Sequence, residues 1–275
     1  MIRTTAFLFS ILFFINHSQP AQALPQQSPV PGGVAFVDLG INTDSRPLVR
    51  YRNDPVMLHR TQNGWQAIIG IPLTAKSGKH YLEISDTNSS SRQMSFIVKA
   101  KKYAEQRLTI KNKRMVNPTA EDMVRIRKEI KIIRKAFANW TEDYSIPAPL
   151  LQPTEGIRSS SFGLRRFFNG QARRPHSGMD IAAPEGQQVI NPAQGKVIAT
   201  GDYFFNGKTV FVDHGQGLIS MFCHLSDIHV RPGQELKRGD EVANVGMTGR
   251  VTGPHLHWSL SLNNTRIDPA LFLQK

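Results

Sequence analysis

The sequence predicts a mainly β protein in which one amphipathic helix joins two β regions. Three observations predict this: short apolar runs with turn signals over residues 34–110, an apolar stripe at helical spacing over residues 119–140, and strand patterns broken by Gly and Pro after residue 150. The chain has 275 residues, of which 40% are hydrophobic. That length and composition leave room for two globular domains.

The first 23 residues have the pattern of a secretory signal peptide. Arg3 carries a positive charge, residues 6–15 form an apolar core, and Ala21-Gln22-Ala23 is a small-residue cleavage site. The apolar core is too short to span a bilayer, which takes about 20 residues. We expect cleavage after Ala23 and export to the periplasm of a Gram-negative bacterium, with an uncleaved anchor as the alternative. Residues 24–33, rich in Pro, Gln and Ser, are expected to form a flexible lead-in.

Residues 34–110 are predicted to form a small β-sandwich. Apolar runs recur at 34–37, 65–69, 81–84 and 94–98, with turn signals at 53–55, 63–64 and 77–78. The region contains His59 and His80 but no cluster with metal-ligand spacing. We therefore assign no chemistry to this domain.

Residues 111–149 are predicted to be a connector with a helix over residues 119–140. Thr119 and Asp122 have the spacing of a capping box, which marks the helix start. The apolar stripe consists of Met123, Ile126, Ile130, Ile133, Phe137 and Trp140. A stripe shorter than three heptads disfavours a coiled coil, so we expect the helix to pack on one or both domains. Pro147, Pro149 and Pro153 end the segment.

Residues 150–275 are predicted to form an antiparallel β domain. Strands are expected at 196–200, 209–213, 218–223 and 255–262, and Asn169-Gly170 is a hairpin-turn signal. No helical pattern of ten residues appears in this region, which favours an all-β architecture.

The strand at 255–262 carries the strongest functional signal. A period of two places His255, His257, Ser259 and Ser261 on one face, which predicts a half-buried strand with a polar front. His176 and Asp180 are expected at the end of a loop and the start of a strand, because nearby Pro and Gly residues disfavour a helix. His224 is a further candidate. Nitrogen and carboxylate ligands without thiolate suit a catalytic zinc with three protein ligands and one open position.

These residues, in this order, resemble the lysostaphin-like (LytM-type) zinc endopeptidases of the bacterial cell wall. The resemblance covers about residues 150–272, and two positions differ from the usual pattern: Phe222 replaces a common Tyr, and Trp258-Ser259 replaces a common aromatic–acid pair. The matching motifs are Ser161-Phe162-Gly163-Leu164-Arg165, residues 176–184, Asp213-His214-Gly215, His224-Leu225-Ser226, Gly246-Met247-Thr248-Gly249, Gly253-Pro254-His255-Leu256-His257 and Asp268-Pro269.

The resemblance implies one Zn²⁺ per chain, held by His176, Asp180 and His257. It also implies that His224 and His255 handle protons and the developing oxyanion, with their individual roles left open. The implied activity is hydrolysis of peptide cross-links in peptidoglycan. Some relatives have lost zinc ligands and only activate other wall hydrolases; this chain keeps all five positions, which favours the enzyme.

The resemblance does not determine which peptide bond of the cross-link is cut. Periplasmic relatives of Gram-negative bacteria usually cleave D-Ala–meso-diaminopimelate cross-links, whereas lysostaphin-type enzymes cut glycine bridges.

Net charge and cysteine content indicate which classes of binding partner to expect. Formal net charge is +13, from 34 Lys and Arg against 21 Asp and Glu, which favours anionic cell-wall peptides. No recognition helix or zinc finger supports a nucleic-acid partner, no transmembrane segment is expected after signal cleavage, and we expect a monomer.

Arg165 and Arg166 are either solvated or clamp a substrate carboxylate, and His214 is expected to be structural. The only cysteine, Cys223, is expected to be a buried thiol on the face opposite His224.

The N-terminal β domain suggests a regulatory hypothesis. An exported wall hydrolase that is always open would threaten its own cell. We expect residues 34–110 to pack near the groove and restrict substrate entry; the alternative is a wall- or partner-binding domain that stands clear of the site.

Overall fold

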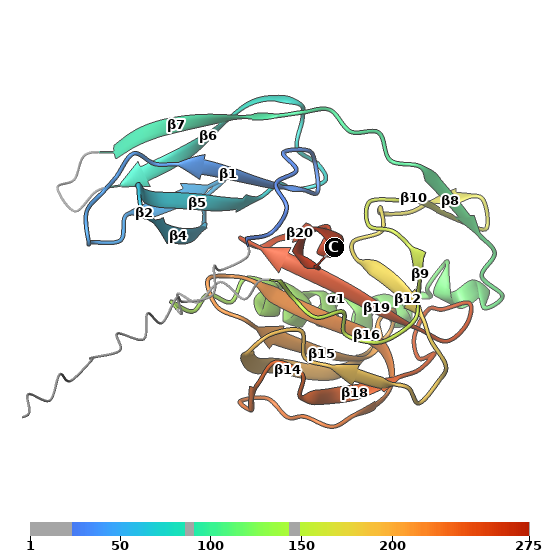
Figure 1. Cartoon of the computed structure of the whole chain (residues 1–275). Helices are drawn as coiled ribbons and strands as arrows, with labels where there is room; N and C mark the ends of the chain where they lie inside the picture. Colours follow the sequence, from blue (N-terminus) through green and yellow to red (C-terminus); the bar gives the residue numbers. More distant parts are fainter. Residues whose placement is uncertain (1–23, 86–90, 143–148, 275) are drawn as a thin grey trace, which may run out of the picture.

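The structure is a computed structural model that describes residues 24–85, 91–142 and 149–274 (Figure 1). The predicted signal peptide and Pro147 lie outside these residues. The predicted mainly β class is confirmed, because strands dominate both halves and α1 is the only α-helix in the described ranges. None of the described helices is long and apolar enough to cross a membrane.

Two small antiparallel sheets form the N-terminal half. The first has the order β1 (Val34–Asp38), β5 (Gly64–Gly70), β4 (Met57–Thr61), and the second has the order β3 (Asp54–Pro55), β2 (Leu48–Tyr51), β6 (Gly78–Ser85), β7 (Ser91–Val98). Alternate residues of both sheets, such as Val37, Ile69 and Leu82, are buried in one shared apolar core.

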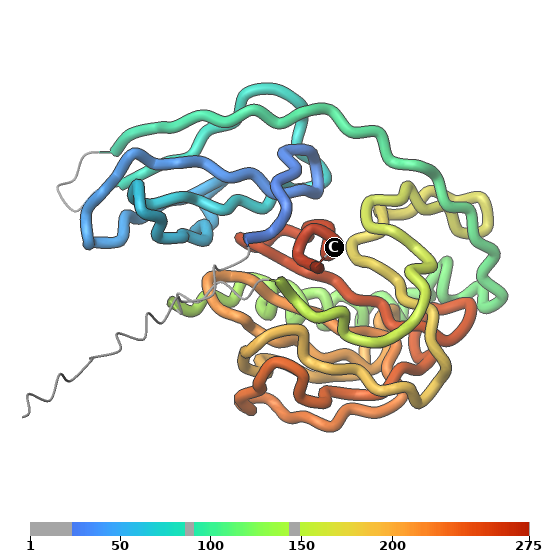
Figure 2. Tube along the Cα trace, in the orientation of Figure 1, coloured from blue at the N-terminus to red at the C-terminus, as the bar shows by residue number. Residues whose placement is uncertain are grey.

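The chain then crosses to the other half of the molecule, as the tube in Figure 2 shows. There β8 (Glu105–Leu108) pairs in parallel with β10 (Arg165–Phe168), which also pairs with β11 (Gln171–Ala172). Asn169 and Gly170 form the turn between β10 and β11 with φ of 50° and 78°, so the predicted hairpin is confirmed. A short 3₁₀ helix, η1 (Lys113–Met115), leads into α1 (Ala120–Phe137).

The ten-stranded sheet is the centre of the C-terminal half. Its main path is β17-β14-β15-β16-β19-β12-β9, with β13, β18 and β20 attached at the side. The strands are β9 (Ile157–Ser160), β12 (Met179–Ala182), β13 (Gln188–Ile190), β14 (Gly195–Tyr203), β15 (Gly207–Asp213), β16 (Ile219–Ile228), β17 (Glu235–Leu236), β18 (Glu241–Val245), β19 (His255–Leu262) and β20 (Thr265–Ile267), followed by the 3₁₀ helix η2 (Pro269–Phe272). All its strand pairs are antiparallel.

The predicted capping box of α1 is present. The Thr119 side chain accepts a hydrogen bond from the Asp122 backbone N–H, and the Asp122 carboxylate accepts one from the Thr119 backbone N–H. The helix ends at Phe137, three residues earlier than predicted. Asn139 and Thr141 both donate side-chain hydrogen bonds to the Asp213 carboxylate, and these bonds draw the chain out of the helix and onto the sheet.

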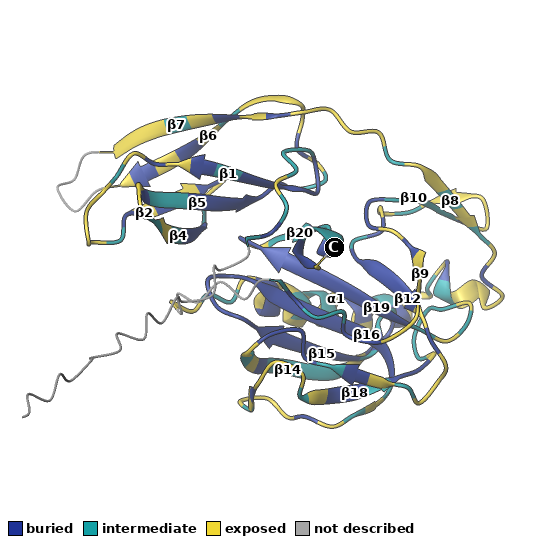
Figure 3. Cartoon of the chain, in the orientation of Figure 1, coloured by how far each residue is buried: buried dark blue, intermediate teal, exposed yellow. Residues whose placement is uncertain are grey.

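Helix α1 covers the sheet face that carries His257, Ser259 and Ser261. Phe137 packs in one cluster with Ile219, Met221 and Cys223, residues of β16 whose register partners on β19 are those same polar residues. The predicted half-buried strand is therefore wrong: Ser259 and Ser261 are fully buried, and β19 is buried along almost its whole length (Figure 3).

The N-terminal sheets dock against the far end of β19, away from its histidines. Val34, Met57 and Ile68 share a core cluster with Leu262 and Ile267. The Asn263 side chain completes this junction, accepting from the Gly70 N–H at 2.6 Å and donating to the Gly70 carbonyl at 3.0 Å. The two halves are thus joined by a buried interface.

Candidate metal centre

Three elements bring the candidate ligands together. Asp180 lies on β12 directly opposite His257 on β19, and His176 lies in the loop that leads into β12. The predicted positions of His176 and Asp180 at a loop end and a strand start are therefore confirmed. Gly178 allows the close approach, because a Cβ there would lie 2.7 Å from His257 Nε2 and 2.6 Å from the Trp258 carbonyl oxygen.

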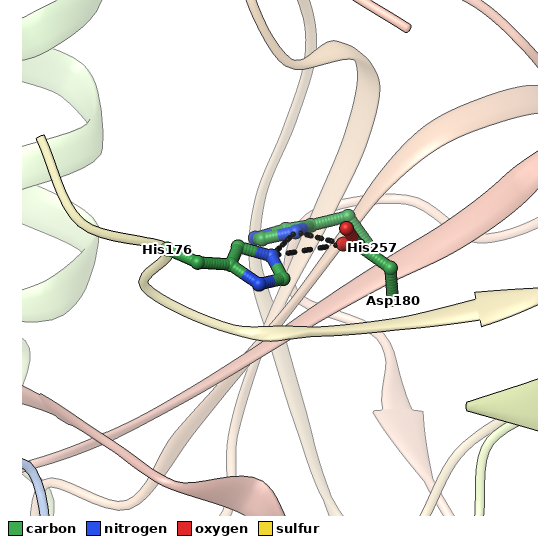
Figure 4. A group of neighbouring side chains, drawn as sticks. All are labelled: His176, Asp180 and His257. Atoms are coloured by element: carbon green, nitrogen blue, oxygen red, sulfur yellow. Dashed lines mark hydrogen bonds and ion pairs between the residues drawn. The ribbon is translucent and has the colours of Figure 1, made fainter. Parts of the chain in front are cut away.

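The three side chains point at a common centre (Figure 4). His257 Nδ1 lies 2.7 Å from Asp180 Oδ1, His176 Nε2 lies 2.9 Å from the same oxygen, and the two nitrogens are 3.0 Å apart. Within the described ranges, these are the only three His, Cys, Asp or Glu side chains that converge in this way. All three are buried.

The hydrogen bonds around this centre show that it suits a cation. His176 Nδ1 lies 2.8 Å from the Ser161 carbonyl oxygen, which can only accept, so in the neutral ring Nδ1 carries the proton and Nε2 presents a lone pair. Ser259 Oγ lies 2.9 Å from His257 Nε2 and can accept its proton, which leaves Nδ1 as a second lone pair. Two lone pairs and a carboxylate oxygen then face one another, an arrangement that a metal ion stabilises.

The pKa values of the buried pair favour the same protonation state. Burial alone would raise the pKa of Asp180, but the contacts with His176 and His257 outweigh it and hold that pKa well below its ordinary value. Burial lowers the pKa of His257 to about 4, although Asp180 acts in the opposite direction. At neutral pH the site therefore offers a carboxylate and a neutral imidazole, the forms that bind metals.

His224 and His255 lie beside this centre without joining it. Their ring centroids are 4.9 Å apart, and the His224 centroid is 5.9 Å from that of His257. Each Nδ1 lies 2.8 Å from a backbone carbonyl, of Thr248 for His224 and of Gly253 for His255, so Nδ1 donates and Nε2 is free to exchange a proton. Burial, followed by repulsion from His255 and His257, holds the pKa of His224 well below its ordinary value.

Backbone geometry explains the position of His224. Cys223 packs in one cluster with Ile219 and Met221, as predicted. Its register partner on β19 is His257, so these β16 residues lie on the same sheet face as the candidate metal ligand His257. His224 adopts a positive φ of 64°, next to a shift in the β15–β16 register, which breaks the alternation. The predicted burial of Cys223 and its place beside Ile219 and Met221 are confirmed, whereas the regular alternation that was expected from Cys223 to His224 is interrupted.

The centre lies in a groove of about 800 Å³. One wall consists of apolar side chains from β8, from the segment between β8 and α1, and from α1 itself. The opposite wall contains the centre itself and the loop before β19. The apolar residues of the first wall are Leu108, Ile110, Val116, Pro118, Met123, Ile126 and Ile130. Of residues 34–110, only three residues of β8 and the segment after it line the groove, and the two N-terminal sheets contribute no lining side chain among the described residues.

The remaining predicted residues divide into two groups. Arg166 donates to the second carboxylate oxygen of Asp180 at 2.7 Å, so it orients a candidate ligand. Arg165 is exposed and pairs with Glu105, and His214 is buried between the Gln194 carbonyl and the Ser220 hydroxyl, as a structural residue would be.

Sequence reasoning missed three further groove arginines, Arg173, Arg174 and Arg250. Arg250 directly follows the Gly246–Gly249 motif, and that adjacency was its only signal.

Fold and site together define a metallopeptidase class, and comparisons with known proteins identify the family. Residues 174–269 match Peptidase family M23, and residues 27–101 match the Peptidase family M23 N-terminal domain. A candidate M23 peptidase from Pseudomonas aeruginosa, known from its crystal structure, is 43% identical over 90% of this chain and 96% of its own, with a TM-score of 0.75. The chain belongs to peptidase family M23, and the resemblance seen in its motifs is confirmed.

Curated relatives share the C-terminal part of the chain. Peptidoglycan DD-endopeptidase ShyA of Vibrio cholerae is 41% identical over 103 residues, which is 37% of this chain and 24% of ShyA. DD-carboxypeptidase/endopeptidase Mpg of Neisseria meningitidis is 35% identical over 111 residues, which is 40% of this chain and 26% of Mpg. The matched region thus spans about a quarter of each of these relatives.

Proposed function

We propose that this protein is an exported, zinc-dependent endopeptidase that hydrolyses peptide cross-links of peptidoglycan, with one Zn²⁺ per chain and acting as a monomer. The observation that carries the proposal is the set of two imidazole lone pairs and one carboxylate oxygen, 2.7–3.0 Å apart, in an open groove. The names of ShyA and Mpg, both peptidases of the D,D class, support the substrate class and an extracytoplasmic location.

In this proposal His176, Asp180 and His257 hold the zinc. A zinc ion there would supply a Lewis acid for the scissile carbonyl and make water available as a nucleophile at neutral pH. The His176–Ser161 and His257–Ser259 hydrogen bonds fix the two rings, and Arg166 fixes the carboxylate.

The two remaining histidines move protons. The Nδ1–H of each ring is held by a backbone carbonyl, so Nε2 of His224 or His255 accepts a proton from the attacking water and returns one to the leaving amine. Protonated, the other imidazole donates to the developing oxyanion, a contribution of roughly 2.7–4 kcal/mol in comparable sites.

A non-catalytic activator of other wall hydrolases is the competing function. An activator has no use for an intact donor set, two proton-carrying histidines and an open groove of about 800 Å³. The complete set therefore favours the enzyme.

The test combines metal analysis with digestion. Mature protein should contain about one zinc per chain and release fragments from purified sacculi, and mass spectrometry of those fragments should show the D-Ala–meso-diaminopimelate bond cut. Zinc-loaded, folded protein that leaves every sacculus intact would show that the chain is no hydrolase.

A further inference from the structure

The groove beside the metal centre is lined by more positive charge than the centre needs. Arg166, Arg173, Arg174 and Arg250 line it, whereas Asp180 is the only acidic residue among its described lining side chains. The Asp180 carboxylate is already engaged by Arg166 and both candidate histidine ligands. The other arginines therefore face the groove with no carboxylate of the groove to neutralise them.

Arg250 is held in place by aromatic rings instead of by an acid. Its guanidinium carbon lies 4.7 Å from the Phe168 ring centroid and 4.4 Å from that of Phe205. Among the described residues, the guanidinium makes one hydrogen bond, a 3.4 Å contact to the Met115 carbonyl. No ion pair to Arg250 occurs within the described parts of the chain. Stacking of this kind holds the plane of a guanidinium and leaves N–H donors at its edge for a planar, two-oxygen anion.

Arg173 extends the same positive region. Its Nη2 donates to the Val116 carbonyl at 2.9 Å and to the side-chain oxygens of Asn117 and Gln171. All of these acceptors are neutral, so they fix the side chain without cancelling its charge.

The electrostatics around Arg250 favour the binding of an anion. Burial, with added repulsion from Arg166 and Arg173, lowers the pKa of Arg250 to about 10. A partly buried cation surrounded by like charges is stabilised when an anion binds beside it.

We propose that Arg250 and Arg173 form a subsite that binds a free carboxylate of the substrate next to the scissile bond. The inference rests on the proposed peptidase function and selects among its substrates. When the side-chain amine of meso-diaminopimelate is acylated by D-Ala, the carboxylate on the same carbon stays free and flanks the scissile amide. A glycine bridge has no carboxylate within the bridge, so the subsite favours the diaminopimelate cross-link.

The experiment compares two substrates that differ at one group. One is a peptide dimer joined by a D-Ala–meso-diaminopimelate bond, and the other is the same dimer with the flanking carboxylate converted to an amide. Wild-type protein should cut the amidated dimer with a KM at least tenfold higher than that of the carboxylate dimer, and with a kcat within about threefold. Loss of a charge-assisted bidentate contact is worth about a factor of ten in affinity. Equal KM values for the two dimers would overturn the proposal, and this arm needs no variant.

Two variants assign the effect to residues. Arg250→Gln should raise KM at least tenfold on the carboxylate dimer and leave KM on the amide dimer nearly unchanged. Arg165→Gln is the matched control, because Arg165 is exposed, pairs with Glu105 and does not line the groove. If Arg250→Gln raises KM equally on both dimers while zinc content and circular dichroism are intact, Arg250 does not read the carboxylate.

Failure of the subsite can be separated from failure of the enzyme. If zinc-loaded wild-type protein cuts neither dimer, the proposed hydrolysis is wrong, and calorimetry with the same uncut dimers still measures the subsite. Binding of the carboxylate dimer at least tenfold tighter than the amide, lost in Arg250→Gln, supports the subsite, and equal binding of both refutes it.

Discussion

Replacing Phe137 by Ala should loosen the connector helix and thereby damage the groove. Phe137 is 1% exposed, its ring packs edge-to-face on Phe211 with centroids 5.4 Å apart, and the Arg266 guanidinium carbon lies 3.5 Å from its centroid. A buried Phe-to-Ala change costs about 3–5 kcal/mol of unfolding free energy. At about 2–4 °C per kcal/mol for a protein of this size, the midpoint of thermal unfolding should fall by roughly 6–20 °C.

The assay is urea and thermal denaturation followed by circular dichroism, with activity on sacculi measured below the transition. Ile132→Ala is the matched control, because Ile132 lies on the outer face of the same helix and is 48% exposed; it should change stability by no more than about 0.5 kcal/mol. Because Met123, Ile126 and Ile130 form one wall of the groove, activity of Phe137→Ala should fall at temperatures where the sheet is still folded. A loss below 1 kcal/mol, or equal losses in the two variants, would refute the packing argument.

Three further predictions concern the centre and the thiol. His176→Ala, Asp180→Ala and His257→Ala should each lose zinc and activity, as measured by elemental analysis and sacculus digestion; full activity with stoichiometric zinc in any of them would remove that residue from the ligand set. His224→Ala and His255→Ala should still bind zinc and fold normally, but their turnover should fall about 10²-fold or more, in line with general acid–base contributions. Loss of the metal in either variant would show that this histidine is a ligand. Burial raises the pKa of Cys223 from 9.0 to about 12, so at pH 9 the folded thiol holds about 500-fold less thiolate than the unfolded one. Native protein should therefore resist a thiol-specific reagent at pH 9 and react once denatured, and its stability should fall as pH rises from 9 towards 12, because the unfolded thiol loses its proton first.

Patterns that depend on neighbouring residues were predictable from the sequence. The period of two in β19 correctly places His255 and His257 on one face, because a strand alternates whatever surrounds it. The capping box at Thr119 was equally local. The turn at Asn169-Gly170 follows from the positive φ that only a few residue types accept easily.

Features set by distant contacts were not predictable. Burial of Ser259 and Ser261 depends on a helix more than a hundred residues earlier in the chain. The end of α1 depends on Asp213, which accepts hydrogen bonds from Asn139 and Thr141. The position of the Arg250 guanidinium depends on contacts with Phe168 and Phe205, which come from other loops and strands. No sequence pattern predicts that these two rings lie beside Arg250.

The position of the connector also changes how the N-terminal half should be viewed. The hypothesis that residues 34–110 restrict substrate entry placed this domain near the groove. The two N-terminal sheets instead dock at the Leu262 end of β19, while β8 and α1, which follow them in sequence, form a wall of the groove.

A chain shortened to begin near residue 147 would therefore lose more than a regulatory domain. It would expose Phe211, Ile219 and Met221, which α1 now covers, and would open the groove on one side. Faster cutting by such a chain could not be assigned to the N-terminal sheets. Substitutions within the N-terminal sheets that leave β8 and α1 in place separate the two effects. Among the described residues, β8, α1 and the segment between them line the groove, whereas the two N-terminal sheets do not.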